Sequence, residues 1–201
     1  MTIDERVREI YRTYNEVICP YVLEYELLSG KFPTEILNEI RSILTHLSKC
    51  FLSDDNKIKE SNIIKAEGHI KRTILDCYKY ICITYDDEYK AFERKYRYTD
   101  LSLIDNGEFL PELLESRKNA IKLMKDARKS DLAINSDNMI NCNEAYKKYE
   151  DAFVAYSSIY NHINNSYKKL ENLRKKTLLK NIFAIGGWII SIILAIFSIF
   201  Y

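Results

Sequence analysis

The chain has 201 residues, of which 47% are hydrophobic and 29% charged, and its formal net charge is +1 at pH 7. This balance argues against a uniformly basic surface for double-stranded DNA. The low content of glycine (5) and proline (3) argues against a β-sandwich or a glycine-rich phosphate loop and favours long helices. The five cysteines form no C-x-x-C pair and follow no signal peptide, so we expect reduced thiols in a cytosolic compartment.

The first predicted helix covers residues 2–29 and carries a single apolar stripe. The stripe runs from Val7 to Leu28 at helical spacing and continues past Pro20. We therefore expect Pro20 to kink this helix without ending it. Gly30 should end the helix, because glycine is common just past a helix C-terminus.

Three further helices complete a predicted all-α bundle in residues 1–134, which we expect to be a cytosolic domain. They are expected at 33–51, from about residue 59 to as far as 98, and from roughly 111 to 132. The clearest linker is TDLSLIDNGEFLP, with Asn106–Gly107 as its turn. No segment has the alternating pattern of a strand.

A long amphipathic helix is predicted over residues 139–180, after a turn and cap at Asn135–Asn138. Its apolar seam has an average period of about 3.5 residues. The seam consists of Tyr146, Tyr149, Phe153, Tyr156, Tyr160, Ile163, Tyr167 and Leu170. Tyrosine hydroxyls need partners when buried, which favours a loose or switchable surface over a leucine zipper. We expect the seam to pack on the protein's own helices, with a self-coiled stalk as the alternative and a possible hinge near Asn164–Asn165.

Residues 181–201 are predicted to form a transmembrane helix. They contain no charged residue, and at about 1.5 Å per residue they can cross a hydrocarbon core of roughly 30 Å. Basic residues precede them, opposed only by Glu171: Lys168, Lys169, Arg174, Lys175, Lys176 and Lys180. Such a cluster belongs on the cytoplasmic side of a membrane. We therefore expect a tail-anchored protein of the inner (plasma) membrane, with its N-terminal domain in the cytoplasm.

Gly187, Ser191 and Ala195 recur every four residues within this segment and so share one helix face. Small residues at this spacing let two membrane helices approach closely. They are the predicted face for self-association and make a homo-oligomer the expected state. The alternative is that they reflect the ordinary composition of a transmembrane helix.

Arg41 and His46 in the second predicted helix have the spacing Arg-x4-His. This spacing resembles the signature of HEPN-domain ribonucleases, helical proteins whose arginine and histidine act on RNA at a dimer cleft. The resemblance implies that Arg41 would stabilise phosphate charge and His46 would transfer protons. On one helix the two side chains lie about 140° apart, so a second chain would have to complete the site. The alternative is an ordinary salt-bridging arginine and a boundary histidine.

His69, Arg72 and Asp76 are a first candidate for binding an anionic ligand. They share one face of the third predicted helix, where Asp76 can orient Arg72 and leave His69 free to titrate. Antiparallel packing would also bring Arg41 close to Glu67–His69. The functional interpretation is a pocket for an anionic small molecule or nucleotide, and the alternative is an exposed salt-bridged face.

The segment Tyr89–Tyr98 is a second candidate, because it interleaves tyrosines with basic residues. Aromatic faces stack on bases and guanidinium groups hold phosphates, so Arg94, Tyr96 and Arg97 are predicted nucleotide contacts. The segment could equally be the solvated end of a helix with Tyr96 in the core.

No metal-ligand set, phosphate loop or catalytic triad order is found in the sequence, so we expect no metal and no cofactor and favour a non-enzymatic function over an enzymatic one. The architecture resembles the tail-anchored membrane effectors of bacterial anti-phage systems. This resemblance implies that a ligand or infection cue sensed by the helical domain drives oligomerisation of the membrane helix and membrane disruption. Two alternatives stay open: a membrane-tethered HEPN-like ribonuclease that uses Arg41 and His46, and a tail-anchored scaffold without a ligand. The expected partners are the lipid bilayer, further copies of the chain and a small nucleotide.

Overall fold

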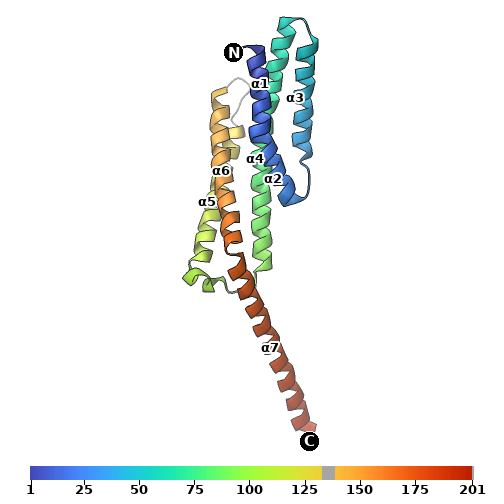
Figure 1. Cartoon of the computed structure of the whole chain (residues 1–201). Coiled ribbons are helices and arrows are strands. Elements are labelled where there is room, and N and C mark those ends of the chain that lie inside the picture. Colours follow the sequence, from blue (N-terminus) through green and yellow to red (C-terminus); the bar gives the residue numbers. More distant parts are fainter. Residues whose placement is uncertain (133–138, 201) are drawn as a thin grey trace.

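The computed structural model describes residues 1–132 and 139–200, with side chains for residues 1–132 and 144–196. All regular elements in these ranges are helices or single helical turns, and none is a strand, which confirms the all-α prediction. Figure 1 shows an elongated bundle from which one long helix, α7, projects at an angle. The predicted cap at Asn135–Asn138 lies outside the described residues.

The first predicted helix is present, with a local change of winding before its proline. It consists of α1 (Ile3–Thr13), a π-helical turn (Tyr14–Ile18) and α2 (Cys19–Ser29). Proline has no N–H to donate to the carbonyl four residues earlier, and its ring crowds that carbonyl. The wider π turn accommodates Pro20, and the chain stays helical past it as predicted. Gly30 ends α2 with a φ of 65°, a left-handed conformation that glycine adopts without steric cost.

Helices α3 (Thr34–Leu52) and α4 (Asn56–Lys95) are antiparallel neighbours joined by a short turn. The predicted bounds of α3 hold to within one residue. Helix α4 starts three residues before the predicted start and stops before Tyr98. Its 40 residues correspond to about 60 Å, so α4 extends along the whole bundle.

Helix α5 (Phe109–Leu132) runs back along α4, and α6 (Met139–Asn165) returns beside both. Two single turns, η2 (Leu101–Leu103) and η3 (Asp105–Gly107), form the predicted linker between α4 and α5. The expected turn is found there, with φ values of 56° at Asn106 and 93° at Gly107.

Two hydrophobic cores share α4. The core remote from α7, here the distal core, joins α1, α2 and α3 to the first half of α4, and it contains Val7, Ile10, Ile18, Ile36, Ile43, Leu47, Cys50, Ile63, Ala66, Ile70 and Cys77. The proximal core joins the second half of α4 to α5, α6 and the start of α7. Within it, Ala120 and Ala127 of α5 and Ala145 and Ala152 of α6 are fully buried. Small side chains at these positions let the helix backbones pack closely.

Most of the tyrosine-rich seam of α6 packs on the protein's own helices, as favoured over a self-coiled stalk. Tyr149, Tyr156 and Leu170 are buried, and Phe153, Tyr160 and Ile163 pack against the proximal core. Phe153 makes an edge contact with Tyr21 at a ring-centroid distance of 5.1 Å. The Tyr149 hydroxyl donates to Asp131 at 3.2 Å, which supplies the partner that a buried hydroxyl needs.

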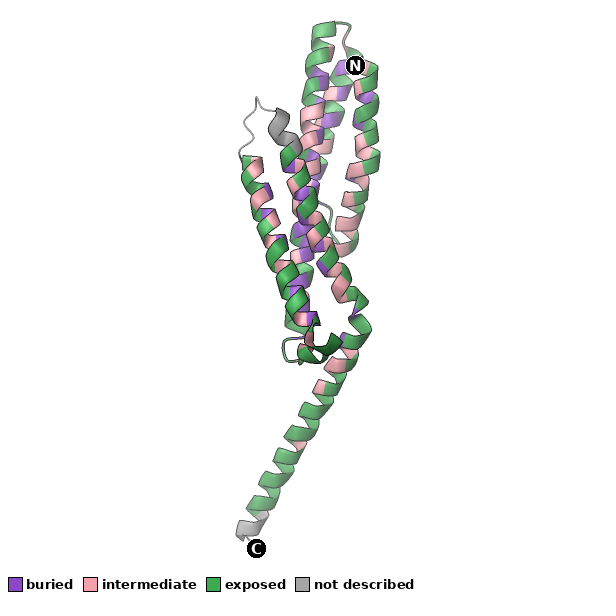
Figure 2. Cartoon of the chain, turned by 90° about the vertical axis from the view of Figure 1, so that its left-hand side faces the viewer, coloured by how far each residue is buried: buried purple, intermediate pink, exposed green. Residues whose placement is uncertain are grey.

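A break in helical structure separates α6 from α7 (Tyr167–Phe200), next to the position considered for a hinge. Ser166 separates the two helices, and its N–H is shared between the carbonyls of His162 (3.3 Å) and Ile163 (3.1 Å). Such three-centre bonds are common at helix ends. Figure 2 shows that buried residues are concentrated inside the bundle, whereas α7 is exposed along most of its length once it leaves the bundle.

Ala152→Leu should lower the free energy of unfolding by about 1–3 kcal/mol, because extra methylene groups in a close-packed core force neighbouring side chains and backbones apart. Thermal unfolding of the full chain in detergent, followed by far-UV circular dichroism, measures the effect. Val154→Leu is the matched control, since Val154 lies on the exposed side of the same helix. Equal losses of stability for the two variants would contradict the close packing of α6.

Candidate functional site

A polar cluster lies between α3 and α4 in the distal half of the bundle. The rings of His46 and His69 are stacked, with centroids 5.2 Å apart and planes inclined by 22°. His46 Nδ1 lies 2.9 Å from Asn62 Oδ1, and His69 Nδ1 lies 2.6 Å from Glu39 Oε2. We call His46, His69, Asn62, Glu39 and the neighbouring Arg72 the histidine cluster.

Helix geometry explains why these residues meet. Antiparallel packing of α3 on α4 brings Glu39 beside His69, and both side chains are mostly covered. Arg72 remains 60% exposed, with its Nε 3.7 Å from Glu39 Oε2 and its Nη2 3.2 Å from His69 Nδ1. The cluster therefore offers one exposed guanidinium beside a hydrogen-bonded histidine, and Glu39 supplies the acidic partner that sequence reasoning assigned to Asp76.

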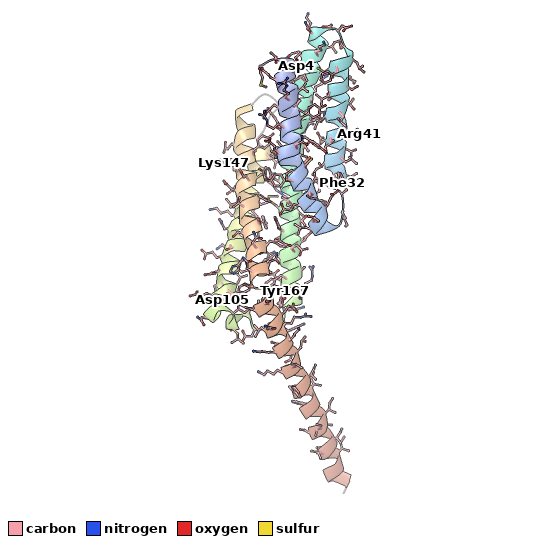
Figure 3. All side chains as sticks on the ribbon, viewed as in Figure 1. Asp4, Phe32, Arg41, Asp105, Lys147 and Tyr167 are labelled. Atoms are coloured by element: carbon pink, nitrogen blue, oxygen red, sulfur yellow. The ribbon has the colours of Figure 1, made fainter. Side chains whose placement is uncertain are left out.

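Arg41 does not join this cluster. Its side chain is exposed, Figure 3 places it on the outer side of α3, and no ion pair involves it among the described side chains. Glu67, which Arg41 was expected to approach, accepts from Arg6 of α1 at 2.6 and 2.7 Å. Within one chain Arg41 and His46 diverge, as their spacing on a helix predicts.

Asp76 belongs to a separate network that connects α4, α5 and α6. Lys79 Nζ lies 3.3 Å from Asp76 Oδ1 and 2.8 Å from Asp131 Oδ2, and Asp131 also accepts from Tyr149. Burial raises the pKa of Asp76 above its usual value, and nearby acids add to this effect, while Lys79 opposes it. Asp76 therefore helps to connect the helices and lies outside the predicted ligand pocket.

The three predicted nucleotide contacts at the end of α4 have different environments. Arg94 and Arg97 are exposed, and the Arg97 guanidinium lies 5.5 Å from the centre of the Tyr98 ring. Tyr96, in contrast, is only 4% exposed, and its ring belongs to the proximal core. Its hydroxyl donates to Glu171 Oε1 at 2.5 Å. Base stacking on Tyr96 would require this residue to leave the core, so the two arginines are the accessible part of the group.

The contacts of Tyr96 reveal a site that sequence reasoning missed. Glu171 of α7 accepts from Tyr96, lies 2.6 Å from Lys95 Nζ and lies 3.6 Å from Arg174. We call Lys95, Tyr96 and Glu171 the junction, because they connect the end of α4 to α7. The sequence signal that could have indicated this site is that Glu171 is the single acid in a strongly basic segment.

A second ion pair reinforces the attachment of α7. Lys169 pairs with Asp105 of the η3 turn, so the linker between α4 and α5 also contacts α7. Figure 3 shows Asp105 and Tyr167 at the same end of the bundle, where α7 begins. Charge-assisted contacts from two separate segments therefore set the direction in which α7 leaves the bundle.

Beyond the bundle, α7 is long enough and apolar enough to cross a membrane, and none of its most apolar window is buried in the fold. Gly187 and Ser191 of the predicted small-residue face are exposed, as is Ala195. The Ser191 hydroxyl donates to the Gly187 carbonyl at 2.9 Å. This bond satisfies the hydroxyl within the helix, which suits an apolar surrounding.

Other chemistry is sparse in the described part of the chain. No group of three or more His, Cys, Asp or Glu side chains there could hold a metal ion. Burial raises the pKa of the Cys77 and Cys82 thiols to about 12, which keeps them protonated and unreactive.

Asp76→Asn should change the dependence of stability on pH. The folded state binds the Asp76 proton more tightly than the unfolded state, because the pKa of Asp76 is raised on folding. The free energy of unfolding therefore falls as pH rises from the pKa of the unfolded state through the raised pKa of the folded state. The stability of the variant relative to wild type should therefore be greater at pH 7 than at pH 4. Melting temperatures across this range measure the difference, with Asp126→Asn, at a half-exposed ion pair, as the control. A pH-independent difference would contradict the effect of partial burial on Asp76.

Tyr96→Phe should loosen the junction by removing one hydrogen bond to a charged acceptor, at a cost of about 1–2 kcal/mol. Hydrogen exchange of the backbone amides in the first turns of α7 should become faster. Tyr98→Phe is the matched control, because the exposed Tyr98 hydroxyl has no hydrogen bond among the described residues. Unchanged exchange in Tyr96→Phe would show that the hydroxyl does not hold α7 in place.

The apolar exposed helix and its attachment to the bundle are thus the features that bear most directly on function. Comparisons of the chain with protein-family models, curated proteins and solved structures found no match.

Proposed function

We propose that this protein is a non-enzymatic membrane effector in which a helical cytosolic bundle controls the self-association of one membrane helix. The observation that carries the proposal is the exposure of α7 beyond the bundle, where its apolar residues have no core to cover them. Apolar surface of this length and on all sides is stable only in a lipid environment. The basic residues ahead of it favour a cytoplasmic bundle at the inner membrane of a bacterium.

The proposed output is an oligomer formed through Gly187, Ser191 and Ala195. In lipid, helices associate through close van der Waals packing, and small side chains permit the closest approach. A leucine side chain would fit at Gly187 in the isolated chain, because a Cβ atom placed there meets no other group within 4 Å. The small residue is therefore not required by the fold of one chain, so replacing it tests contact between chains without disturbing the bundle.

The proposed input is a ligand or infection cue that acts on the bundle and is transmitted through the junction. The exposed Arg72 of the histidine cluster is the predicted contact for an anionic ligand, such as a small nucleotide. Helix α4 carries Asn62, His69 and Arg72 of this cluster in its first half, and it ends at Lys95, next to Tyr96. A shift of α4 along its axis would therefore act directly on Glu171. In a bacterial defence setting, release of α7 would precede assembly and damage to the membrane.

Gly187→Leu should abolish the oligomer and the growth defect caused by expression of the full chain. Gly186→Leu is the matched control, because it makes the same change about 100° away around the helix and also meets open space. Oligomer size in mild detergent, growth and membrane permeability to a dye are the measurements. Both variants should insert in the membrane to the same extent.

Three outcomes would count against the proposal. If both variants keep the oligomer and the toxicity, the small-residue face has no role. If expression causes neither a growth defect nor dye entry, a scaffold without a ligand replaces the effector. RNA cleavage by the full chain that is lost in His46→Ala would instead favour the HEPN-like ribonuclease.

A further inference from the structure

The end of the bundle nearest the membrane helix exposes an aromatic ring and an apolar side chain that take no part in either core. Tyr98, just past α4, is 79% exposed, and Leu103 of the η2 turn is 67% exposed. Arg97 stacks on the Tyr98 ring, so a guanidinium and an aromatic face are presented together. Tyrosine and arginine combine an apolar body with a polar tip and are favoured at the boundary between lipid and water.

The position of this surface along α7 places it close to the proposed bilayer. Leu103 and Asn106 line one surface hollow together with Leu173 and Lys176 of α7. Lys176 lies about 8 Å along the helix axis before Asn181, where the uncharged segment begins. The headgroup layer on each side of a bilayer is about 5–7 Å thick. Because α7 leaves the bundle at an angle (Figures 1 and 2), an upright bundle requires a tilted α7, and a tilt of about 20° is common for membrane helices.

Charge at this end favours an anionic partner. Two of its acids are paired, Glu171 with Lys95 and Asp105 with Lys169, whereas Asp100, Glu108 and Glu112 make no ion pair among the described side chains. Six cations at the same end make no ion pair within the described side chains: Arg94, Arg97, Lys168, Lys175, Lys176 and Lys180. Positive charge on a surface that faces the cytoplasmic leaflet is attracted to anionic headgroups within a Debye length, about 8 Å at physiological ionic strength.

We propose that Arg97, Tyr98 and Leu103 form a second membrane contact, which docks the end of the bundle on the anionic headgroups of the leaflet that α7 enters. The occupant is a surface of anionic phospholipid: the guanidinium contacts phosphate, while the aromatic ring and Leu103 rest in the outer part of the headgroup layer. This inference rests on the membrane insertion of the proposed function, but it requires neither oligomerisation nor toxicity.

Docking would hold the bundle upright on the membrane. With α7 as the single membrane contact, the bundle and α7 could tilt or rotate together relative to the bilayer, whereas a second contact beside α7 fixes their orientation. Docking also holds the junction at a fixed height above the bilayer, because α4 ends at the docked surface and α7 enters the bilayer beside it.

Single-tryptophan variants in lipid nanodiscs test this contact in the full chain. The chain contains one tryptophan, Trp188, which reports insertion through quenching by a lipid brominated in its acyl chains. Trp188→Phe combined with Tyr98→Trp reports docking through quenching by a lipid with a nitroxide on its headgroup. Trp188→Phe combined with Leu52→Trp is the matched control, because Leu52 is similarly exposed (84%) but lies at the opposite end of the bundle.

We expect headgroup quenching at position 98 in phosphatidylglycerol discs, little in neutral phosphatidylcholine discs, and none at position 52. Adding Arg97→Glu should lower the equilibrium constant for docking roughly fivefold or more, since each cation near an anionic surface contributes a factor of about five.

Quenching of Trp188 without quenching at position 98 would overturn docking and leave insertion intact. Equal quenching in neutral and anionic discs would overturn the anionic partner, and equal quenching at positions 98 and 52 would overturn the upright orientation. Failure to quench Trp188 would instead refute the membrane insertion of the proposed function.

Discussion

The rest of the fold depends on one helix, α4, which is buried along both of its halves. Helix α4 contributes Ile63 and Ala66 to the distal core and Ile81 and Tyr85 to the proximal core, and all four side chains are at most 3% exposed. Most of the stability of a helix in a folded protein comes from the apolar surface that it buries, and α4 buries such surface along its whole length. The other helices of the bundle are shorter, and each covers only part of α4. The two halves of the bundle are therefore linked mechanically, although their cores are separate.

Polar contacts then determine how the covered faces are oriented. Arg6 joins α1 to α4 through Glu67, Lys79 joins α4 to α5 through Asp131, and Lys95 joins α4 to α7 through Glu171. Each pair is partly exposed, so its contribution to stability is modest. Its effect on geometry is larger, because a misplaced helix would leave a charge without a partner near the protein surface.

Much of this fold follows from local patterns in the sequence. Apolar spacing gives the helix faces, and Gly30 and Asn106–Gly107 mark the breaks, because these signals act within a few residues. The continuation past Pro20 was also predictable, although the π turn that permits it was not. The break between α6 and α7 lies at Ser166, next to Asn164–Asn165, where the sequence left a hinge open.

The candidate site was less predictable, because its contacts are distant in the sequence. Glu171 and Tyr96 are 75 positions apart, and no periodicity indicates that they meet. The same holds for His69, which is paired with Glu39 across the α3–α4 contact, while Asp76, on its own helix, turns toward Lys79. Tyr96 was assigned to a ligand because its segment interleaves tyrosines with basic residues. The structure shows the alternative, Tyr96 in the core, because at the end of a helix one residue can be buried between two that face solvent.

The rotational setting of α7 has a consequence for how chains could assemble. Glu171 points toward α4, and Ser191 follows it by about 200° around the helix, so the small-residue face is directed nearly opposite to the bundle. Two copies that met through this face would carry their bundles on the outside of the pair. The bulky cytosolic bundles would then not collide. In a larger assembly, the small-residue faces of the helices, rather than the bundles, would line the centre.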